Sequence, residues 1–213
     1  GERLDALDEV MEQSREAIQG DVQALSEAQR SLAELVRDEP GLEPDNTAAL
    51  IERAAQSFSE AEQQQALGTM EGYQASLALS RTAVQQLAEA RAAMAALPGR
   101  LATLRDLAGV ASPAVLAEWR ARAARVREQL QVYTRHWDTE MAGCAGEATA
   151  LLDRAEALLG RLAIGVRQVK RVRESELAHA TEVLTEARDA ILAAGERVEA
   201  LEAELARVEA LRA

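Results

Sequence analysis

Apolar residues recur every seven positions near both ends of the chain. Near the N-terminus the series is Leu4, Met11, Ile18, Leu25 and Leu32. Near the C-terminus it is Leu177, Leu184, Ile191, Val198 and Leu205, with an alanine-rich companion series between its members. A seven-residue repeat draws one apolar stripe along a helix, and that stripe packs against neighbouring helices. The repeat predicts an all-α fold of long helices in an elongated antiparallel bundle or coiled coil.

The composition supports helices and restricts the partners. Hydrophobic residues make up 48 % of the 213 residues, yet aromatic residues make up only 2 %. Alanine, leucine, glutamate and arginine, which dominate, are strong helix formers. The net charge of −12 argues against nucleic acid, because proteins that bind it usually present a basic face. No apolar run is long enough to span a membrane, so we expect membrane contact only through segments outside this chain.

The compartment stays open, with the cytoplasm favoured. A single cysteine excludes an internal disulfide but does not select a redox environment. No secretory signal pattern is visible. Helical pattern begins at the first residues and continues to the last ones, which predicts that the chain is a segment of a longer protein.

Proline and glycine divide the chain into predicted helices. The first helix should end at "DEPGLEPDN", residues 38–46, and a second should begin after Asn46 or Thr47. Residues 67–73 predict a turn or a kink. "LPG" at 97–99 predicts the end of a third helix, and a short helical piece, "RLATLRDLAGV", should follow it. We expect a three-helix unit over 1–99, a connector over 100–112, and a second three-helix unit over 113–213.

The second half of the chain carries its own signals for helix ends. Ser112 is the predicted cap of a helix whose first residue is Pro113, where the missing N–H costs nothing. Further along, the apolar register slips by one residue near Gly143 and Gly146, which predicts a kink, a bulge or a tight turn. The segment "GRLAIGVRQ" is another predicted break.

Two pairs of similar segments indicate an internal repeat. "LIERA" at 50–54 is similar to "LLDRA" at 151–155, and "AEARAA" at 88–93 is similar to "TEARDA" at 185–190. A period near 100 residues, three helices per unit and heptads together resemble the spectrin-type triple-helical repeat, over roughly 5–97 and 106–210. In that resemblance Trp119 stands for a tryptophan early in the first helix of a unit. The resemblance implies a structural rod.

One cluster of rare residues raises the question of a metal or redox site. His136, Glu140 and Cys144 are spaced at i, i+4 and i+8. On a helix the first and third of these lie about 12 Å apart along the axis, whereas bonds to zinc are about 2.0–2.3 Å long. We therefore expect no metal and no cofactor, and we interpret Cys144 as a buried core residue.

The chain has a basic segment that is a candidate docking site. Its positive residues are Arg161, Arg167, Lys170, Arg171 and Arg173. They could bind an acidic partner or a lipid headgroup, or they could pair with neighbouring glutamates on a solvated surface. Residues 120–128, "RARAARVRE", form a second arginine cluster, whose side-chain stems could cover apolar seams.

The motifs of common enzymes are missing from the sequence. It contains no glycine-rich phosphate loop, nucleophile elbow or HExxH pattern, so we predict a protein that is not an enzyme. The favoured function is a structural or scaffolding rod segment that binds protein partners, or itself, through helical faces. The alternatives are a coiled-coil arm of a chromosome-organising or membrane-associated ATPase, and a bundle that binds a small ligand around His136, Trp137 and Cys144.

Overall fold

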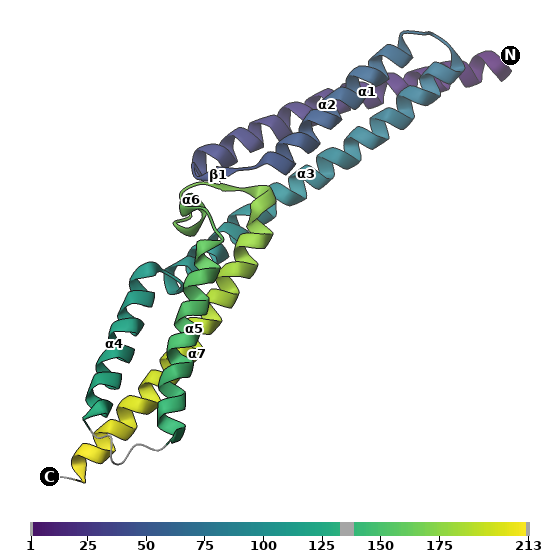
Figure 1. Cartoon of the computed structure of the whole chain (residues 1–213). Coiled ribbons are helices and arrows are strands. Elements are labelled where there is room, and N and C mark those ends of the chain that lie inside the picture. The colour runs from purple at the N-terminus through teal and green to yellow at the C-terminus, as the bar shows by residue number, and fades with distance from the viewer. Residues whose placement is uncertain (1, 133–138, 212–213) are drawn as a thin grey trace. The chain divides into compact units, whose positions relative to one another are not determined.

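A computed structural model of the chain describes residues 2–132 and 139–211. The prediction of an all-α helical bundle is confirmed (Figure 1). The helices are α1 (Glu2–Asp38), α2 (Asp45–Gln65), α3 (Met70–Val110), α4 (Pro113–Gln131), α5 (Thr139–Gly160), α6 (Ile164–Arg167) and α7 (Leu177–Ala210). Two short strands, β1 (Leu42–Glu43) and β2 (Val172–Arg173), pair in a sheet that the sequence did not predict, and a 3₁₀ turn spans Glu174–Glu176.

The chain divides into two compact units. The first contains Gly1–Arg100 together with Arg173–Ser175, and the second contains Leu101–Val172 and Glu176–Ala213. Helix α3 therefore supplies residues to both units. The predicted repeat of a three-helix unit stays a prediction, since a division into units does not test it.

The first unit is built from α1, α2 and the first part of α3. Its core joins side chains of all three helices: Ala28, Ile51, Ala54, Phe58, Ala83, Leu87, Ala90 and Met94. Four of these core residues are alanines, whose small side chains fill little of the space between the helices. Gln65, near the end of α2, donates a hydrogen bond of 3.3 Å to the Ser14 hydroxyl of α1, as expected for antiparallel neighbours.

Two polar layers interrupt the apolar seam between α1 and α3, at the positions where the heptad series is polar. Ser14 is fully buried, and its hydroxyl donates to Ser76 Oγ over 3.1 Å. One heptad further on, Asp21 is only 6 % exposed and accepts a hydrogen bond from the Ser80 hydroxyl. Burial raises the pKa of the Asp21 carboxyl from 3.8 to about 6. These hydrogen bonds satisfy polar groups that would otherwise be buried without partners.

The prediction that the third helix ends at 97–99 is wrong. Helix α3 continues through Pro98 to Val110. Proline removes one backbone hydrogen bond from a helix interior, but the leucines around it hold the helix in place. Leu97, Leu101 and Leu104 are all at most 1 % exposed, and burying each side chain contributes about 1.5–3 kcal/mol. Packing therefore outweighs the local preference for a break, and residues 100–110 of the expected connector are helical.

Helix α2 begins at Asp45, just before the start that the sequence predicts, and its first turn is capped from a distant segment. Its N-cap position is Pro44, whose side chain makes no capping hydrogen bond. Instead, the buried Glu174 carboxylate accepts the Thr47 N–H over 2.8 Å. The Asp45 carboxylate accepts from both the N–H and the hydroxyl of Ser175, at 3.0 and 2.5 Å. Residues 173–175 thereby belong to the first unit.

The second unit packs α4, α5 and α7 side by side (Figure 1). Its core contains Val126, Leu130, Ala148, Val198, Leu201 and Leu205. Ser112 caps α4 as predicted, because its Oγ accepts the Val115 N–H over 3.3 Å and Pro113 is the first helical residue. The long periodic helix at the C-terminus is also confirmed as α7.

The tight turn that the register slip allowed at Gly143 and Gly146 is not formed. Gly143 and Gly146 are both inside α5, whereas α4 already ends at Gln131 and α5 begins at Thr139. A glycine costs a helix interior about 1 kcal/mol relative to alanine. The buried stripe of Ala148, Leu152 and Ala155 compensates for this cost. The break predicted in "GRLAIGVRQ" is confirmed, because α5 ends at Gly160.

Within the described residues, no helix is both long and apolar enough to cross a bilayer.

Candidate functional site

A groove of about 600 Å³ runs along α4 and α5 in the second unit. On α4 it is lined by residues spaced at helical intervals, among them Arg120, Ala123, Ala124, Arg127 and Gln131, and on α5 by Thr149, Leu152 and Asp153. The floor consists of small and apolar side chains. The charged lining residues give a positive excess on α4 and a negative charge on α5.

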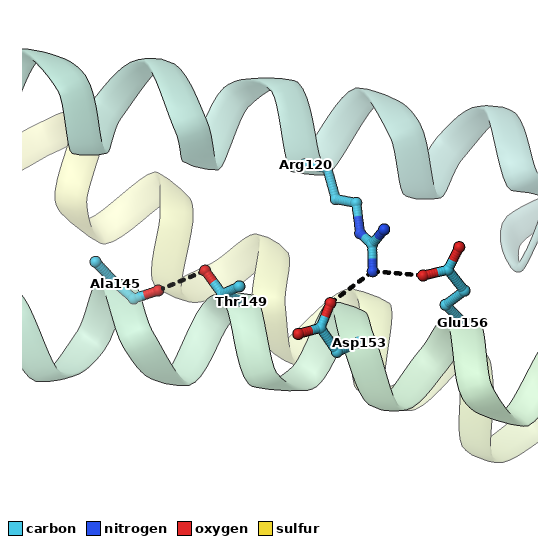
Figure 2. A network of polar contacts seen from close by, with 5 residues as sticks. All are labelled: Arg120, Ala145, Thr149, Asp153 and Glu156. Atoms are coloured by element: carbon cyan, nitrogen blue, oxygen red, sulfur yellow. Dashed lines mark hydrogen bonds and ion pairs between the residues drawn. The ribbon is translucent and has the colours of Figure 1, made fainter.

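The α4 side of the groove carries three arginines and one glutamate, Glu128, whereas the α5 side carries Asp153, with Glu156 one turn further on. Arg120 Nη2 lies 2.6 Å from Asp153 Oδ1 and 2.7 Å from Glu156 Oε2, so one guanidinium bridges two turns of α5 (Figure 2). Thr149 lies further along the same helix, and its hydroxyl donates over 3.0 Å to the Ala145 carbonyl instead of reaching across the groove (Figure 2). Arg125 and Arg127 also line the groove and are exposed. Solvent-exposed pairs such as these contribute little stability, so the rims are free to serve recognition.

The other side of α4 is fixed on α7. The Arg122 guanidinium donates two hydrogen bonds to Glu202, from Nε over 3.1 Å and from Nη2 over 2.6 Å. The same guanidinium lies 4.2 Å from the centre of the Trp119 ring, in the geometry of a cation–π contact. Hydrogen bonding from Arg122 lowers the pKa of Glu202 below 4.5, although burial partly opposes it.

The Trp119 ring rests against a glycine of α7. A Cβ added at Gly195 would lie 2.8 Å from Trp119 Cζ2, which is too close for two carbon atoms. Glycine at this position lets the indole approach α7 this closely. Trp119 and Arg122 together therefore set the position of α4, and with it the geometry of the groove.

The five residues of the predicted basic docking segment are divided between the two units. Arg173 belongs to the first unit, where its Nε lies 3.5 Å from Glu43 Oε2. Arg161, Lys170 and Arg171 are exposed in the second unit, and Arg167 is half-buried at the end of α6. Arg167 lines a groove together with Arg105 of α3.

A tight turn follows α6 and holds this basic segment. The Lys170 N–H donates to the Gly165 carbonyl over 2.8 Å, and the Val169 N–H donates to the Val166 carbonyl over 3.0 Å. This is the hydrogen-bond pattern of a Schellman motif, which normally places glycine at the left-handed position. Here that position is Val169, with a φ of 51°.

The histidine and cysteine cluster lies partly outside the described residues. His136 and Trp137 fall in that gap, and the side chain of Glu140 is not described either. Cys144 is half-buried on α5 and packs against the core of the second unit. In the part of the chain that the structure covers, no group of three or more His, Cys, Asp or Glu residues could hold a metal ion.

Sequence reasoning singled out the arginine cluster at 120–128 but missed the groove. The signal that could have found it is the series at 120, 123, 124, 127 and 131, which marks a second face of α4 beside the core-facing one. A scan against family models finds no match for this chain, and neither curated proteins nor solved structures show significant similarity to it. The fold itself defines the class: the chain is an all-α helical bundle protein.

Proposed function

We propose that this chain is a helical scaffold and that the groove between α4 and α5 docks an α-helix of a protein partner. The observation that carries the proposal is the excess of arginine on the α4 side opposite the carboxylates of α5, in a groove that is also lined by Ala123, Ala124 and Leu152. The role is binding without catalysis. The spectrin-like rod architecture remains part of the same proposal.

The groove suits a helix because of its shape and composition. Its α4 face repeats with the period of a helix, and Ala123 and Ala124 leave room for close approach of another backbone. Charged rims around a less polar centre are the usual anatomy of a protein interface. Complementary charges steer a partner and fix its orientation more than they add affinity.

The charges of the rims define the partner. Arg125 and Arg127 on α4 favour acidic side chains. Asp153 and Glu156 on α5 can exchange their exposed ion pairs with Arg120 for pairs with basic side chains of a partner. A helix with an acidic edge, a basic edge and a stripe of alanine and leucine between them satisfies both rims. A helix with two acidic edges meets repulsion at α5.

Synthetic helical peptides test the proposal by fluorescence anisotropy. Three peptides share one apolar stripe and differ only in their edges: one acidic and one basic, both acidic, or both basic. We expect the mixed peptide to bind several-fold more tightly than either of the others. Replacing Arg125 and Arg127 with glutamate should weaken its binding, whereas Arg161→Glu, an exposed arginine outside the groove, should not. Equal binding of all three peptides, or no binding, would contradict the proposal.

A further inference from the structure

A second groove lies beside α6 in the second unit, apart from the docking groove. It has a volume of about 470 Å³ and is lined by Arg105, Ala108, Gly109, Ser112, Pro113, Arg167, Gln168 and Val169. This lining contains two arginines and, among the residues that the structure describes, no carboxylate. On a chain with a net charge of −12 this is a local reversal of sign.

Arg167 has an unsatisfied donor at this groove. Its Nε is buried and has no hydrogen-bond partner among the described residues. A buried donor without a partner costs about 1–3 kcal/mol, and more when the group is charged. Because Nε itself is covered, a ligand in the groove would meet the accessible part of the Arg167 guanidinium, and its negative charge would offset the cost of a charged group whose donors are incompletely paired.

The structure holds the two arginines on fixed supports. Arg105 is on α3, and Arg167 is the last residue of α6, directly before the strained turn at Val169. Such strain often accompanies a site whose geometry must be held. Ser112 and Pro113 also line the groove, so the positive end of the α4 dipole lies at the same place.

We propose that this groove binds a phosphate group, with Arg167 and Arg105 as its ligands. Guanidinium groups bind phosphate and carboxylate through paired hydrogen bonds. Phosphate fits better here, because its three or more oxygens can accept from two guanidinium groups at once, whereas a carboxylate offers only two oxygens. The site is separate from the helix-docking groove, so it adds to the proposed scaffold role without depending on it.

Titration of the full chain with inorganic phosphate tests the site. Isothermal calorimetry at constant ionic strength should give saturable binding, and the melting temperature should rise with phosphate but not with chloride. Arg167→Gln and Arg105→Gln should each weaken binding by about tenfold or more, in line with the loss of a charged hydrogen bond. Arg161→Gln is the matched control, since Arg161 is exposed in the same unit and does not line the groove.

Three results would overturn the proposal. Phosphate that binds no better than chloride would show that there is no site, and acetate that binds as tightly as phosphate would show that the ligand is not a phosphate. An equal loss of binding in Arg161→Gln would show diffuse attraction instead of a built site. Because Arg167 is half-buried, far-UV circular dichroism should accompany its variant. If Arg167→Gln loses helicity, the phosphate affinity of Arg105→Gln, a substitution on a different helix, tests the site instead.

Discussion

Val169 is the one described non-glycine residue with a positive φ, and its backbone conformation opposes its side chain. A β-branched residue in the left-handed region costs of order 1–2 kcal/mol. Glycine removes that strain, but the unfolded chain is then more flexible and loses more conformational entropy on folding. We expect Val169→Gly to raise the free energy of unfolding by about 0.5–1 kcal/mol, measured by urea denaturation.

The neighbouring Val166 supplies the control for that substitution. It is only 6 % exposed and lies inside α6. Val166→Gly should therefore lower stability, through lost burial and a poorer helix former. If Val169→Gly destabilises the chain as Val166→Gly does, the left-handed strain at Val169 is not a real cost.

Asp21 makes the stability of the first unit depend on pH. Burial raises its folded-state pKa to about 6, above the ordinary value of 3.8. The fold thus favours the protonated carboxyl, and its stabilising contribution is complete below about pH 3.8 and lost as the pH rises through about 6. We expect Asp21→Asn to be more stable than the natural chain at pH 7.5 by about 1–3 kcal/mol, and nearly equal to it at the acid end.

Denaturation across this pH range, with both proteins side by side, measures the difference. Asp38→Asn is the control, because Asp38 is an exposed aspartate of the same helix with a side chain that is 68 % exposed. The difference in unfolding free energy between Asp38→Asn and the natural chain should change much less with pH. A stability difference for Asp21→Asn that does not vary between pH 4 and 7.5 would refute the assignment.

At the scale of helices, two glycines that both lie inside helices, one buried and one exposed, predict opposite effects on substitution. Gly195 lies inside α7 under the Trp119 ring, whereas an added Cβ at Gly143 in α5 would have no atom within 4 Å. Gly143→Ala should stabilise by about 1 kcal/mol through helix propensity. Gly195→Ala should destabilise by about 1–3 kcal/mol, since the indole must move from α7.

Thermal and urea denaturation of the two variants provide the comparison. The change in indole fluorescence adds a local readout for Gly195→Ala. A stabilising Gly195→Ala would show that the Trp119 ring can shift at little cost, and the account of how α4 is positioned would then fail.

The sequence predicted the helices well where a periodic stripe agreed with local signals. The end of α1, the Ser112–Pro113 start of α4 and the full length of α7 follow from heptads and caps. The prediction was wrong at Pro98, a residue that usually ends a helix. Buried leucines on both sides of it keep α3 helical, and their burial depends on contacts between helices that a local pattern does not show. The capping of Thr47 by Glu174, 127 residues away, has no local signal at all.

The candidate sites were less predictable than the helices. The basic segment was visible as a composition, but whether its residues lie in a groove depends on a turn that the sequence disfavours, because valine rarely adopts a positive φ. The docking groove depends on how far α4 and α5 stand apart. The position of α4 also involves its contact with α7 at Trp119 and Gly195, and no spacing rule pairs these two residues.

At the scale of the whole molecule, each unit uses its charges differently. Buried polar layers fall within the first unit, at Ser14 and Asp21, and specify the register of α1 on α3. The second unit instead carries arginines along the solvent-facing rim of α4. We interpret the buried polar layers of the first unit as groups that define its fold, and the exposed arginines of the second unit as groups that recognise a partner.

The most direct test of the scaffold proposal is to map the mixed-edge peptide onto the chain by NMR. Amide shifts of the isotope-labelled full chain would be followed as the peptide is added. We predict changes confined to the groove faces, residues 120–131 of α4 and 149–156 of α5, and their loss when Arg125 and Arg127 are replaced by glutamate. Changes centred on α1, α2 or α7, or no changes at saturating peptide, would contradict the claim that this groove docks a partner helix.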